Sequence, residues 1–548
     1  MMTRRSLAIV AALLAVAVPA AAQTVSERID YSVAQRIRDE EMNRGKLDDL
    51  ASYLTDVIGA RLTNSTGSRK ANAWAAETFT SWGLANVKQE AWDSAFGRGW
   101  DVVAYSGRIL DPWVKPLAAY PQAWSGSTLD NRGRPTTVTC PVVALNVTDS
   151  ADVAKYRGKL KGACVLRSPA PETEPEFNQQ ERRFSVDQLI NGTPNRPGVI
   201  STVPDEPYQP PAPAAGGNPN AAAGFRRAAA LNALVADLIR TEGVAVILQP
   251  SRWGYGMFLN GGHSDGRRAR DSVYNPTPEL IVAQEQYGSL YRVAQRGLPV
   301  RVEVNLQTRF LDDNRFPTNV TAELPGTDKA DEVVMLGAHF DSWHSGTGAT
   351  DNGAGSVVMM EAIRLLKALN LPLRRTVRIG LWTGEEQGLI GSRTWIRMHR
   401  DELAKVSAYV NVDNGTGRLR GIWDQSNEAA IPIFQQMLAP FQDLGVVAVK
   451  HGNTGGTDHL AFVAAGVPGF NFIQDPIEYG TRTHHSNLDT YDHLVIDDLK
   501  QAAAVVAFTV YSLANRDAPM PRPPAAGSPA PAGALTPAPT TLPQATRA

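Results

Sequence analysis

The C-terminal half of the sequence predicts an α/β layer fold with a largely parallel central sheet. Two observations support this prediction. Short apolar runs alternate with longer segments whose apolar residues recur at helical spacing. Residues with metal-binding side chains follow the apolar runs, where strands of a parallel sheet end in loops. The predicted strands are 333–337, 377–382 and 406–412, and the predicted helices are 353–369 and 387–398.

Two amphipathic helices open the predicted fold. Apolar residues at helical spacing indicate one helix over 47–58 and another over 71–82. A chain of this length is too large for one core and should contain two or three domains. The predicted division is a leader at 1–22, a first part of the main domain at 23–124, an insert at 125–285, a second part of the main domain at 286–515 and a disordered Pro- and Ala-rich tail at 516–548.

The middle segment of the sequence differs from the rest in composition and in the spacing of its predicted elements. Predicted strands at 163–166 and 244–248 are separated by a stretch rich in Pro, Gly and Asn and by a helical pattern. It shows no convincing cluster of metal ligands, so we interpret 125–285 as an inserted binding or gating domain. The two cysteines of the chain, Cys140 and Cys164, both lie here. They could pair if their strands are neighbours, or remain as two buried thiols.

The N-terminus predicts the compartment. A basic start at Met1–Arg5 is followed by an apolar run over 6–18 and by Ala20-Ala21-Ala22 ahead of Gln23, which is typical of a secretory signal peptide. A permanent anchor would need about 20 apolar residues. We therefore expect an extracytoplasmic protein, periplasmic or secreted. Arg4-Arg5 also fits a twin-arginine leader, so the export route stays open.

The charge balance favours neither nucleic acid nor an anionic membrane as a partner. Removing Arg4 and Arg5 with the leader reduces the 54 basic residues to 52 against 55 acidic residues, a net charge of about −3. Such a nearly balanced chain lacks the basic excess that these partners require.

Side chains suited to metal binding follow one another in a distinctive order. They are His339, Asp351, the pair Glu385 and Glu386, Asp413 and His485. Zinc accepts imidazole nitrogen and carboxylate oxygen, and a two-metal hydrolytic site needs one bridging carboxylate. Asp351 is the candidate bridge because glycines surround it with backbone freedom.

We assign two zinc ions to this set. His339 and Asp413 would complete one ion, and Glu386 and His485 the other, with Asp351 shared. Glu385 would remain outside the metal ligands and carry a proton from the attacking metal-bridged water to the leaving amine. Asp341 and Asp489 are expected to orient His339 and His485. Singly, each residue also suits a solvated surface or a turn, but their clustering at successive strand ends argues against chance.

Four sequence stretches resemble the motifs of the co-catalytic zinc aminopeptidase and glutamate carboxypeptidase family, especially its carboxypeptidase Q (plasma glutamate carboxypeptidase) branch. They are Gly337-Ala338-His339-Phe340-Asp341-Ser342-Trp343, residues 346–355, Leu381-Trp382-Thr383-Gly384-Glu385-Glu386-Gln387-Gly388 and His484-His485-Ser486-Asn487-Leu488-Asp489-Thr490. The resemblance covers nearly the whole mature chain except the tail.

The resemblance implies a three-layer zinc-exopeptidase-like domain with a β-rich protease-associated insert. Carried over by position, it implies the metal ligands His339, Asp351, Glu386, Asp413 and His485, with Glu385 as general base. The stretch 455–459 resembles a loop that lines the family's active site. Many relatives carry a tyrosine where this chain has His484, which could donate the same hydrogen bond to a developing oxyanion or merely steer His485.

The function expected from these features is exopeptidase hydrolysis of short peptides, as a dipeptidase or an aminopeptidase. The expected partner is a short peptide, without nucleic acid and without a membrane once the leader is removed, and a homodimer stays open. The alternatives are a glutaminyl cyclase-type acyltransferase and a non-catalytic binding ectodomain on the same fold. A serine hydrolase is a third alternative because residues 262–266 match the nucleophile-elbow pattern, but they lack the flanking apolar strand.

Overall fold

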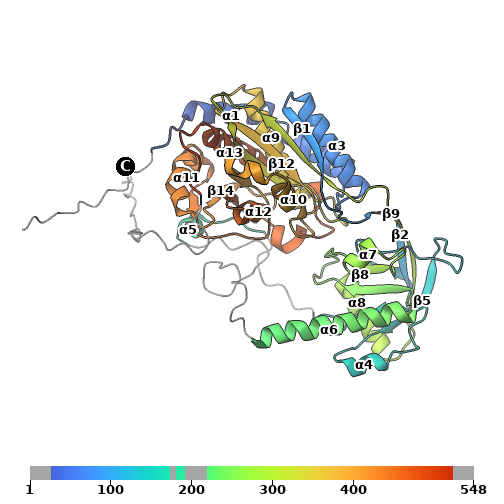
Figure 1. The fold of residues 1–548 in the computed structure, drawn as a ribbon. Helices are drawn as coiled ribbons and strands as arrows, with labels where there is room; N and C mark the ends of the chain where they lie inside the picture. Colours follow the sequence, from blue (N-terminus) through green and yellow to red (C-terminus); the bar gives the residue numbers. More distant parts are fainter. Residues whose placement is uncertain (1–25, 173–180, 192–218, 523–548) are drawn as a thin grey trace, which may run out of the picture.

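The computed structural model describes residues 26–172, 181–191 and 219–522. The strands of these residues form two eight-stranded sheets. Figure 1 shows the first sheet with its helices in the upper body and the second sheet below it, with the long helix α6 beside the second sheet. The predicted leader at 1–22 and residues 523–548 of the predicted tail lie outside the described residues.

The first sheet is mixed, and its centre is parallel. Strands β12, β11, β13 and β16 run parallel, whereas β1, β10 and β14 each join a neighbour antiparallel. In spatial order its strands are β1 (Ala85–Ala91), β10 (Thr318–Leu324), β12 (Arg375–Trp382), β11 (Lys329–His339), β13 (Val406–Asn411), β16 (Gly469–Gln474), β14 (Leu419–Trp423) and β15 (Ala448–Lys450). The predicted α/β layer fold is confirmed, with antiparallel strands added at both sides of its parallel centre.

Helices cover both faces of this sheet, which makes three layers. Alternate residues of β11 point to opposite faces: Leu336 packs in a large core with α1, α2, α3, α9, α11 and α13, and Met335 packs in a smaller core with α10 and α12. These helices are α1 (Tyr31–Arg44), α2 (Leu47–Ser52), α3 (Thr66–Ser81), α9 (Ala354–Ala368), α10 (Ile390–Met398), α11 (Ile431–Met437), α12 (His459–Ala464) and α13 (Ile496–Asn515).

Shorter helical turns connect these elements. They are η1 (Tyr53–Ile58), η2 (Ala349–Gly353), η3 (Arg400–Lys405), η4 (Glu428–Ala430), η5 (Ala439–Leu444), η6 (Tyr479–Thr483) and η7 (Tyr491–His493). Within the described ranges, no helix has the length and apolar character needed to cross a bilayer.

The second sheet lies in one continuous stretch of sequence between residues 99 and 311, which we name the second-sheet unit. Its strands, in spatial order, are β3 (Lys115–Pro116), β2 (Gly99–Asp111), β9 (Arg301–Leu311), β5 (Val138–Ala144), β6 (Cys164–Leu166), β7 (Val246–Pro250), β8 (Glu279–Val282) and β4 (Ala119–Pro121). Its helices are α4 (Ser150–Ala154), α6 (Pro219–Glu242), α7 (Arg267–Asp271) and α8 (Gln284–Gln295). Helix α5 (Val186–Ile190) lies in the same stretch of sequence but packs against β15 and β16 of the first sheet.

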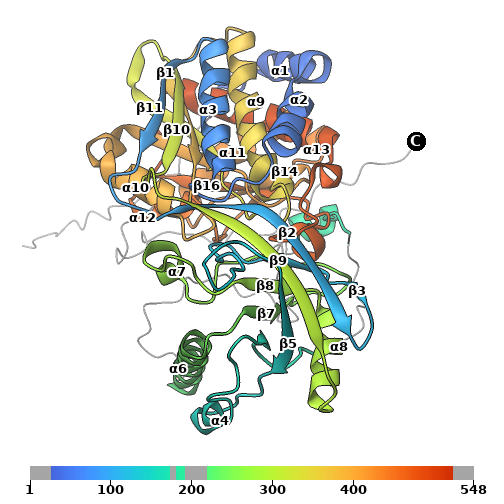
Figure 2. The same cartoon turned by 90° about the vertical axis from the view of Figure 1, so that its right-hand side faces the viewer.

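The second-sheet unit is wider than the predicted insert at 125–285. Strands β2 and β9 pair antiparallel from Gly99–Leu311 to Asp111–Arg301, and Figure 2 shows them as a long two-stranded ribbon running between the two sheets. Local patterns do not reveal this pairing because the partners are distant in sequence. The protease-associated character of the unit stays a prediction.

The structure bears on two local predictions, the state of the two cysteines and the disorder of the C-terminal tail. Cys140 and Cys164 form a disulfide between β5 and β6, with their Cα atoms 5.5 Å apart. The start of the predicted disordered tail is packed: Arg516 pairs with Glu27 at 2.8 Å, and Met520 is buried. The tail prediction was therefore wrong for residues 516–522, because one apolar side chain and one buried ion pair hold this segment on the fold.

Candidate metal centre

The candidate ligands gather at one edge of the first sheet. Strand β11 ends at His339, and Glu386 and Asp413 follow β12 and β13. Because these strands are parallel, their carboxyl ends meet at the same edge. Asp351 lies in η2, which leads into α9, and His485 follows η6 in the loop after β16. All five predicted ligands are brought together.

Asp351 lies between two histidines and offers one oxygen to each. Its Oδ1 lies 3.2 Å from His339 Nε2, and its Oδ2 lies 3.2 Å from His485 Nε2. Asp413 Oδ1 lies 3.5 Å from His339 Nε2, and Glu386 Oε2 lies 2.9 Å from His485 Nε2. We name His339, Asp413 and Asp351 Oδ1 the His339 half-site, and Glu386, His485 and Asp351 Oδ2 the His485 half-site.

Three buried carboxylate oxygens in this cluster accept no hydrogen bond. They are Asp351 Oδ2, Glu386 Oε1 and Asp413 Oδ1. Buried polar atoms are nearly always paired, because an unpaired one loses its hydration without compensation. The orphaned oxygens belong to three carboxylates around two imidazoles, a donor set that suits zinc. The residues present therefore fit bound cations.

Burial and charge shift the titration of this cluster strongly. Loss of hydration raises the pKa of Glu386 well above its usual range, and the neighbouring Asp351 raises it further. Burial alone would lower the pKa of His339, but the nearby carboxylates, Asp413 foremost, raise it well above its ordinary value. Burial would raise the pKa of Asp351, yet the surrounding histidines, His339 first, hold it below its usual range. The site concentrates negative charge that cations would balance.

The Glu385 carboxyl differs from that of Glu386 in its contacts. Burial raises the pKa of the Glu385 carboxyl well above its usual range, the His339 imidazole opposes this rise, and Asp413 adds to it. Among the described residues, the ion pair that ties Glu386 to His485 has no counterpart at the Glu385 carboxylate. A carboxyl with a raised pKa beside a hydrolytic centre is suited to accept and return a proton.

Asp341 and Asp489 hold the ligand residues in position through hydrogen bonds. The main-chain oxygen of Asp341 lies 3.0 Å from His339 Nδ1, and its carboxylate accepts the main-chain N–H groups of Glu385 and Glu386 at 3.1 and 3.4 Å. Asp489 accepts the main-chain N–H of Asp351 at 3.2 Å and the Thr350 hydroxyl at 2.8 Å. Asp489 thus orients the bridging residue rather than His485, because its carboxylate points into the η2 turn.

Arg61 supports the same turn and was not found from the sequence. Its fully buried guanidinium donates to the main-chain oxygens of Phe340, Thr347 and Gly348 at 2.8, 2.7 and 2.7 Å. Burial lowers the pKa of Arg61 to about 10, so it stays charged at neutral pH. Gly348 has φ of +64°, and a Cβ there would lie 2.2 Å from Ser342 Cβ. The close packing around Arg61 therefore requires glycine.

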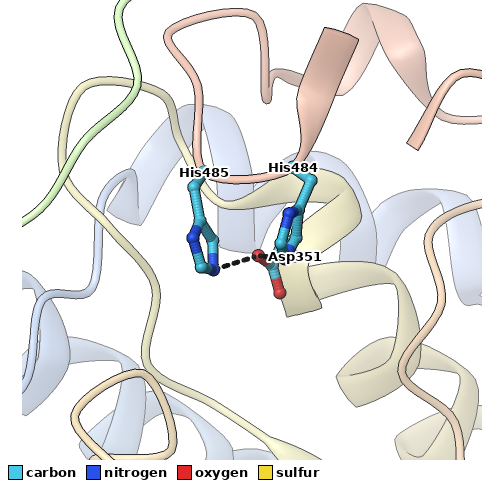
Figure 3. A group of neighbouring side chains, drawn as sticks. All are labelled: Asp351, His484 and His485. Carbon is cyan, nitrogen blue, oxygen red and sulfur yellow. Dashed lines mark ion pairs between the residues drawn. The ribbon is translucent and has the colours of Figure 1, made fainter. Parts of the chain in front are cut away.

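His484 lies beside the His485 half-site. Its ring stacks on His485 with centroids 3.9 Å apart, and its Nε2 lies 3.8 Å from Asp351 Oδ2. Figure 3 shows both imidazoles reaching the Asp351 carboxylate from adjacent positions of one loop. Burial lowers the pKa of His484 to about 4, so the ring is neutral near pH 7 and can donate one N–H. Asp351, His484 and His485 also form a possible cation-binding group.

The stretch 455–459 packs beside the His339 half-site. The Asp458 carboxyl is buried, accepts a hydrogen bond from Ser392, and leaves its Oδ2 without a partner. Burial raises the pKa of Asp458 to about 7, and the His339 imidazole opposes that rise. Thr457 accepts a hydrogen bond from Asn411 at the end of β13.

Comparison with known proteins identifies the domain that carries this site. Residues 319–510 match the model of "Peptidase family M28", and this segment is a peptidase M28 domain. The chain is 34% identical to Carboxypeptidase Q of Mus musculus over 262 residues, which cover 47% of this chain and 54% of that protein. It is 35% identical to Probable leucine aminopeptidase 2 of Arthroderma benhamiae over 212 residues, 36% of this chain and 41% of that protein. The chain spans about half the length of the curated relatives it matches.

Solved structures share the fold over most of the chain. A peptidase M28 precursor from Shewanella amazonensis superposes with a TM-score of 0.63 at 24% identity, covering 90% of this chain and 99% of that one. A zinc aminopeptidase from Bacillus subtilis superposes with a TM-score of 0.54 at 17% identity, covering 86% and 95%. These matches establish a common architecture.

Proposed function

We propose that this chain is a zinc-dependent exopeptidase that hydrolyses short peptides. The observation that carries the proposal is the division of Asp351 between two half-sites, with Oδ1 toward His339 and Oδ2 toward His485. A carboxylate shared in this way is what two neighbouring cations require. The names of the similar proteins, carboxypeptidase and aminopeptidase, support removal of residues from a peptide end.

Each half-site would hold one zinc ion. His339, Asp413 and Asp351 would bind one ion, and Glu386, His485 and Asp351 the other. The chemistry that bound zinc supplies is polarisation of the peptide carbonyl and a lowered pKa for water. Asp341 keeps His339 and the main chain of Glu385 and Glu386 in place for this task.

The protein's own acid and base groups complete the reaction. Glu385 takes a proton from the attacking water and returns it to the leaving amine, because its carboxylate lies beside the ligands without the ion pair that holds Glu386. His484, a neutral ring beside Asp351, donates its N–H to the oxygen of the substrate carbonyl as negative charge develops there.

Peptide-end specificity can be tested directly. The zinc-loaded protein is incubated with an unblocked dipeptide, the N-acetylated dipeptide and an aminoacyl anilide, each with and without a chelator. Metal-dependent cleavage of the free dipeptide alone indicates a dipeptidase, and cleavage of the anilide as well indicates an aminopeptidase. Absence of metal-dependent cleavage overturns the proposal. Ring closure of an N-terminal glutaminyl peptide would instead indicate a cyclase.

We also propose that the protein acts outside the cytoplasm. The disulfide between Cys140 and Cys164 supports an oxidising compartment, where such bonds persist. The signal-like sequence at 1–22 agrees with this location. N-terminal sequencing of protein from the cell envelope or medium should begin near Gln23. An intact Met1 terminus and a cytoplasmic location would contradict the proposal.

A further inference from the structure

The loop that carries His485 is held by the second-sheet unit as well as by its own sheet. We define the His485 loop as residues 475–487, which follow β16 and contain η6. Two separate segments of the second-sheet unit, 257–260 and 181–190, contact this loop near its two ends. The ligands of the His339 half-site instead come from strand ends and η2 of the first sheet.

The segment 257–260 contacts the C-terminal end of the His485 loop. The main-chain N–H of Asn260 donates to the main-chain oxygen of His485 itself at 2.8 Å. The main-chain N–H of Phe258 donates to Asn487 Oδ1 at 2.7 Å, and Leu259 forms an isolated β-bridge with Ser486. Three consecutive residues of the second-sheet unit thus hold the ligand residue and the two residues after it.

The segment 181–190 contacts the N-terminal end of the loop. The main-chain N–H of Arg182 donates to the oxygen of Ile477 at 3.0 Å. Asp475, which is fully buried, accepts the main-chain N–H of Phe184 at 2.9 Å and pairs with the Arg183 guanidinium at 3.2 Å. Phe184 and Leu189 pack in a small core with Ile473 of β16.

His485 needs these contacts because its backbone is unusual. Its φ is +58°, in the left-handed region that non-glycine residues rarely adopt. Such a conformation is unfavourable for a residue with a side chain and persists where surrounding contacts hold it. The hydrogen bond from Asn260 to the His485 oxygen acts directly on this peptide group.

We propose that the second-sheet unit builds the His485 half-site, with Asn487 and Arg183 as positioning residues. They act through the loop main chain, which sets where the His485 imidazole meets Glu386 and Asp351. The inference rests on the proposed two-metal function. It assigns the second-sheet unit a direct part in metal binding at the His485 half-site, where its contacts reach the ligand residue itself.

Cobalt binding to the full-length chain tests this inference. Co²⁺ suits the same nitrogen and oxygen ligands, and its visible absorption reports coordination. Metal-free protein is titrated with Co²⁺ for wild type, Asn487→Leu and Asn487→Asp. Leucine removes the acceptor for the Phe258 N–H at similar size, and aspartate keeps an acceptor. We expect two ions in wild type, a 10- to 100-fold weaker second ion in Asn487→Leu, and recovery in Asn487→Asp.

A second pair of variants shows whether a loss of metal binding results from misfolding rather than from the loss of the contact. Arg183→Ala removes the guanidinium contact to Asp475 from the other segment, together with the ion pair of the same guanidinium with Asp498 of α13. It should weaken the same ion while leaving the first ion unchanged. Arg69→Ala, which removes an exposed ion pair with Asp313, is the matched control and should bind both ions as wild type does. Circular dichroism and the melting temperature of the metal-free protein identify any variant that is unfolded.

The outcomes separate this inference from the function on which it rests. Two ions bound with wild-type affinities by both Asn487→Leu and Arg183→Ala would overturn the inference and leave the proposed function intact. Equal weakening of both ions would also overturn it, because the two half-sites would then respond together. Wild-type protein that binds no Co²⁺ would overturn the proposed function itself, together with the inference.

Discussion

The Asp341 carboxylate accepts the main-chain N–H of Glu385 with Oδ1 at a distance of 3.1 Å. Its Oδ2 lies 3.4 Å from the main-chain N of Glu386 and 2.9 Å from the Thr63 hydroxyl. One buried carboxylate therefore holds the backbone of both glutamates. The side chain of Glu385 can change without releasing this turn, so its chemical role can be separated from its structural surroundings.

Replacing Glu385 with glutamine should abolish proton transfer while preserving metal binding. The amide has almost the same size, and Asp341 still holds the main chain of residue 385. We expect kcat to fall by about 10²–10⁴-fold, the usual contribution of a general acid–base group. Steady-state kinetics on the cleaved peptide and zinc analysis of the same samples provide the measurement. Near-normal turnover, or loss of zinc, would contradict the assignment of Glu385 as the base.

Replacing His485 with alanine should affect one half-site only. Glu386 would lose the imidazole 2.9 Å from its Oε2, whereas His339 and Asp413 would keep their positions. We expect one zinc ion to be lost or bound much more weakly and the other to remain. Metal analysis after equilibrium dialysis checks this result, with His339→Ala as the reciprocal variant. Unchanged zinc content in His485→Ala would show that His485 is not a ligand.

Replacing His484 with phenylalanine distinguishes its two available roles. The phenyl ring can keep the stack on His485 but has no N–H to donate. If His484 stabilises the oxyanion, kcat should fall by about 10²–10³-fold at unchanged zinc content. Parallel assays of kcat, KM and bound zinc provide the measurement. Loss of one zinc ion would instead make His484 a ligand alongside His485 and Asp351.

The metal ligands could largely be predicted from the sequence, but the residues that support them could not. His339, Glu386 and Asp413 follow apolar strands, and parallel pairing places such ends at one edge, so their proximity could be predicted. Arg61 could not, because a single arginine in a loop carries no periodic signal. Its role arises from three main-chain oxygens of residues far away in sequence.

For the fold as well, elements with strong local sequence patterns could be predicted, and features set by contacts between distant residues could not. Strands β11, β12 and β13 have dense apolar runs and were predicted, whereas α1 was missed because its buried apolar side chains, Val33, Ala34 and Ile37, are few in a polar segment. The limits of the second-sheet unit depend on the pairing of β2 with β9. Contacts of that kind join distant residues and leave no local pattern.

A buried pair of carboxyl groups, Glu41 of α1 and Glu361 of α9, predicts a pH dependence of stability away from the metal centre. Both side chains are buried, and neither oxygen of Glu41 accepts a hydrogen bond from the described residues. Burial, and then the facing Glu361, raise the pKa of Glu41 to about 9, and Arg364 and Lys500 oppose the rise. Glu41 is therefore neutral in the folded protein at pH 7.

The sign of the effect follows from this raised pKa. In the unfolded chain Glu41 ionises near its ordinary pKa of 4.5, so folding must take up a proton at any pH between that value and about 9. Stability from this group is complete at low pH and is lost as the pH rises through that window. Glu41→Gln mimics the neutral carboxyl at every pH. It should therefore stabilise the protein at pH 8.5 and have little effect at pH 5.

The neighbouring Glu40 offers a control of opposite sign. Its hydrogen bond with Arg44 lowers its pKa below the ordinary 4.5, against the effect of burial, so the stability from its ionised form is nearly complete above that pH and is lost only in more acidic solution. Glu40→Gln should therefore destabilise the protein by about the same amount at pH 5 and at pH 8.5. Thermal unfolding of chelator-treated wild type, Glu41→Gln and Glu40→Gln at both pH values measures the two effects without a contribution from metal. For Glu41→Gln we expect a melting temperature above wild type at pH 8.5 that converges on wild type at pH 5. A difference of equal size at both pH values would show that burial and the facing Glu361 do not raise the pKa of Glu41.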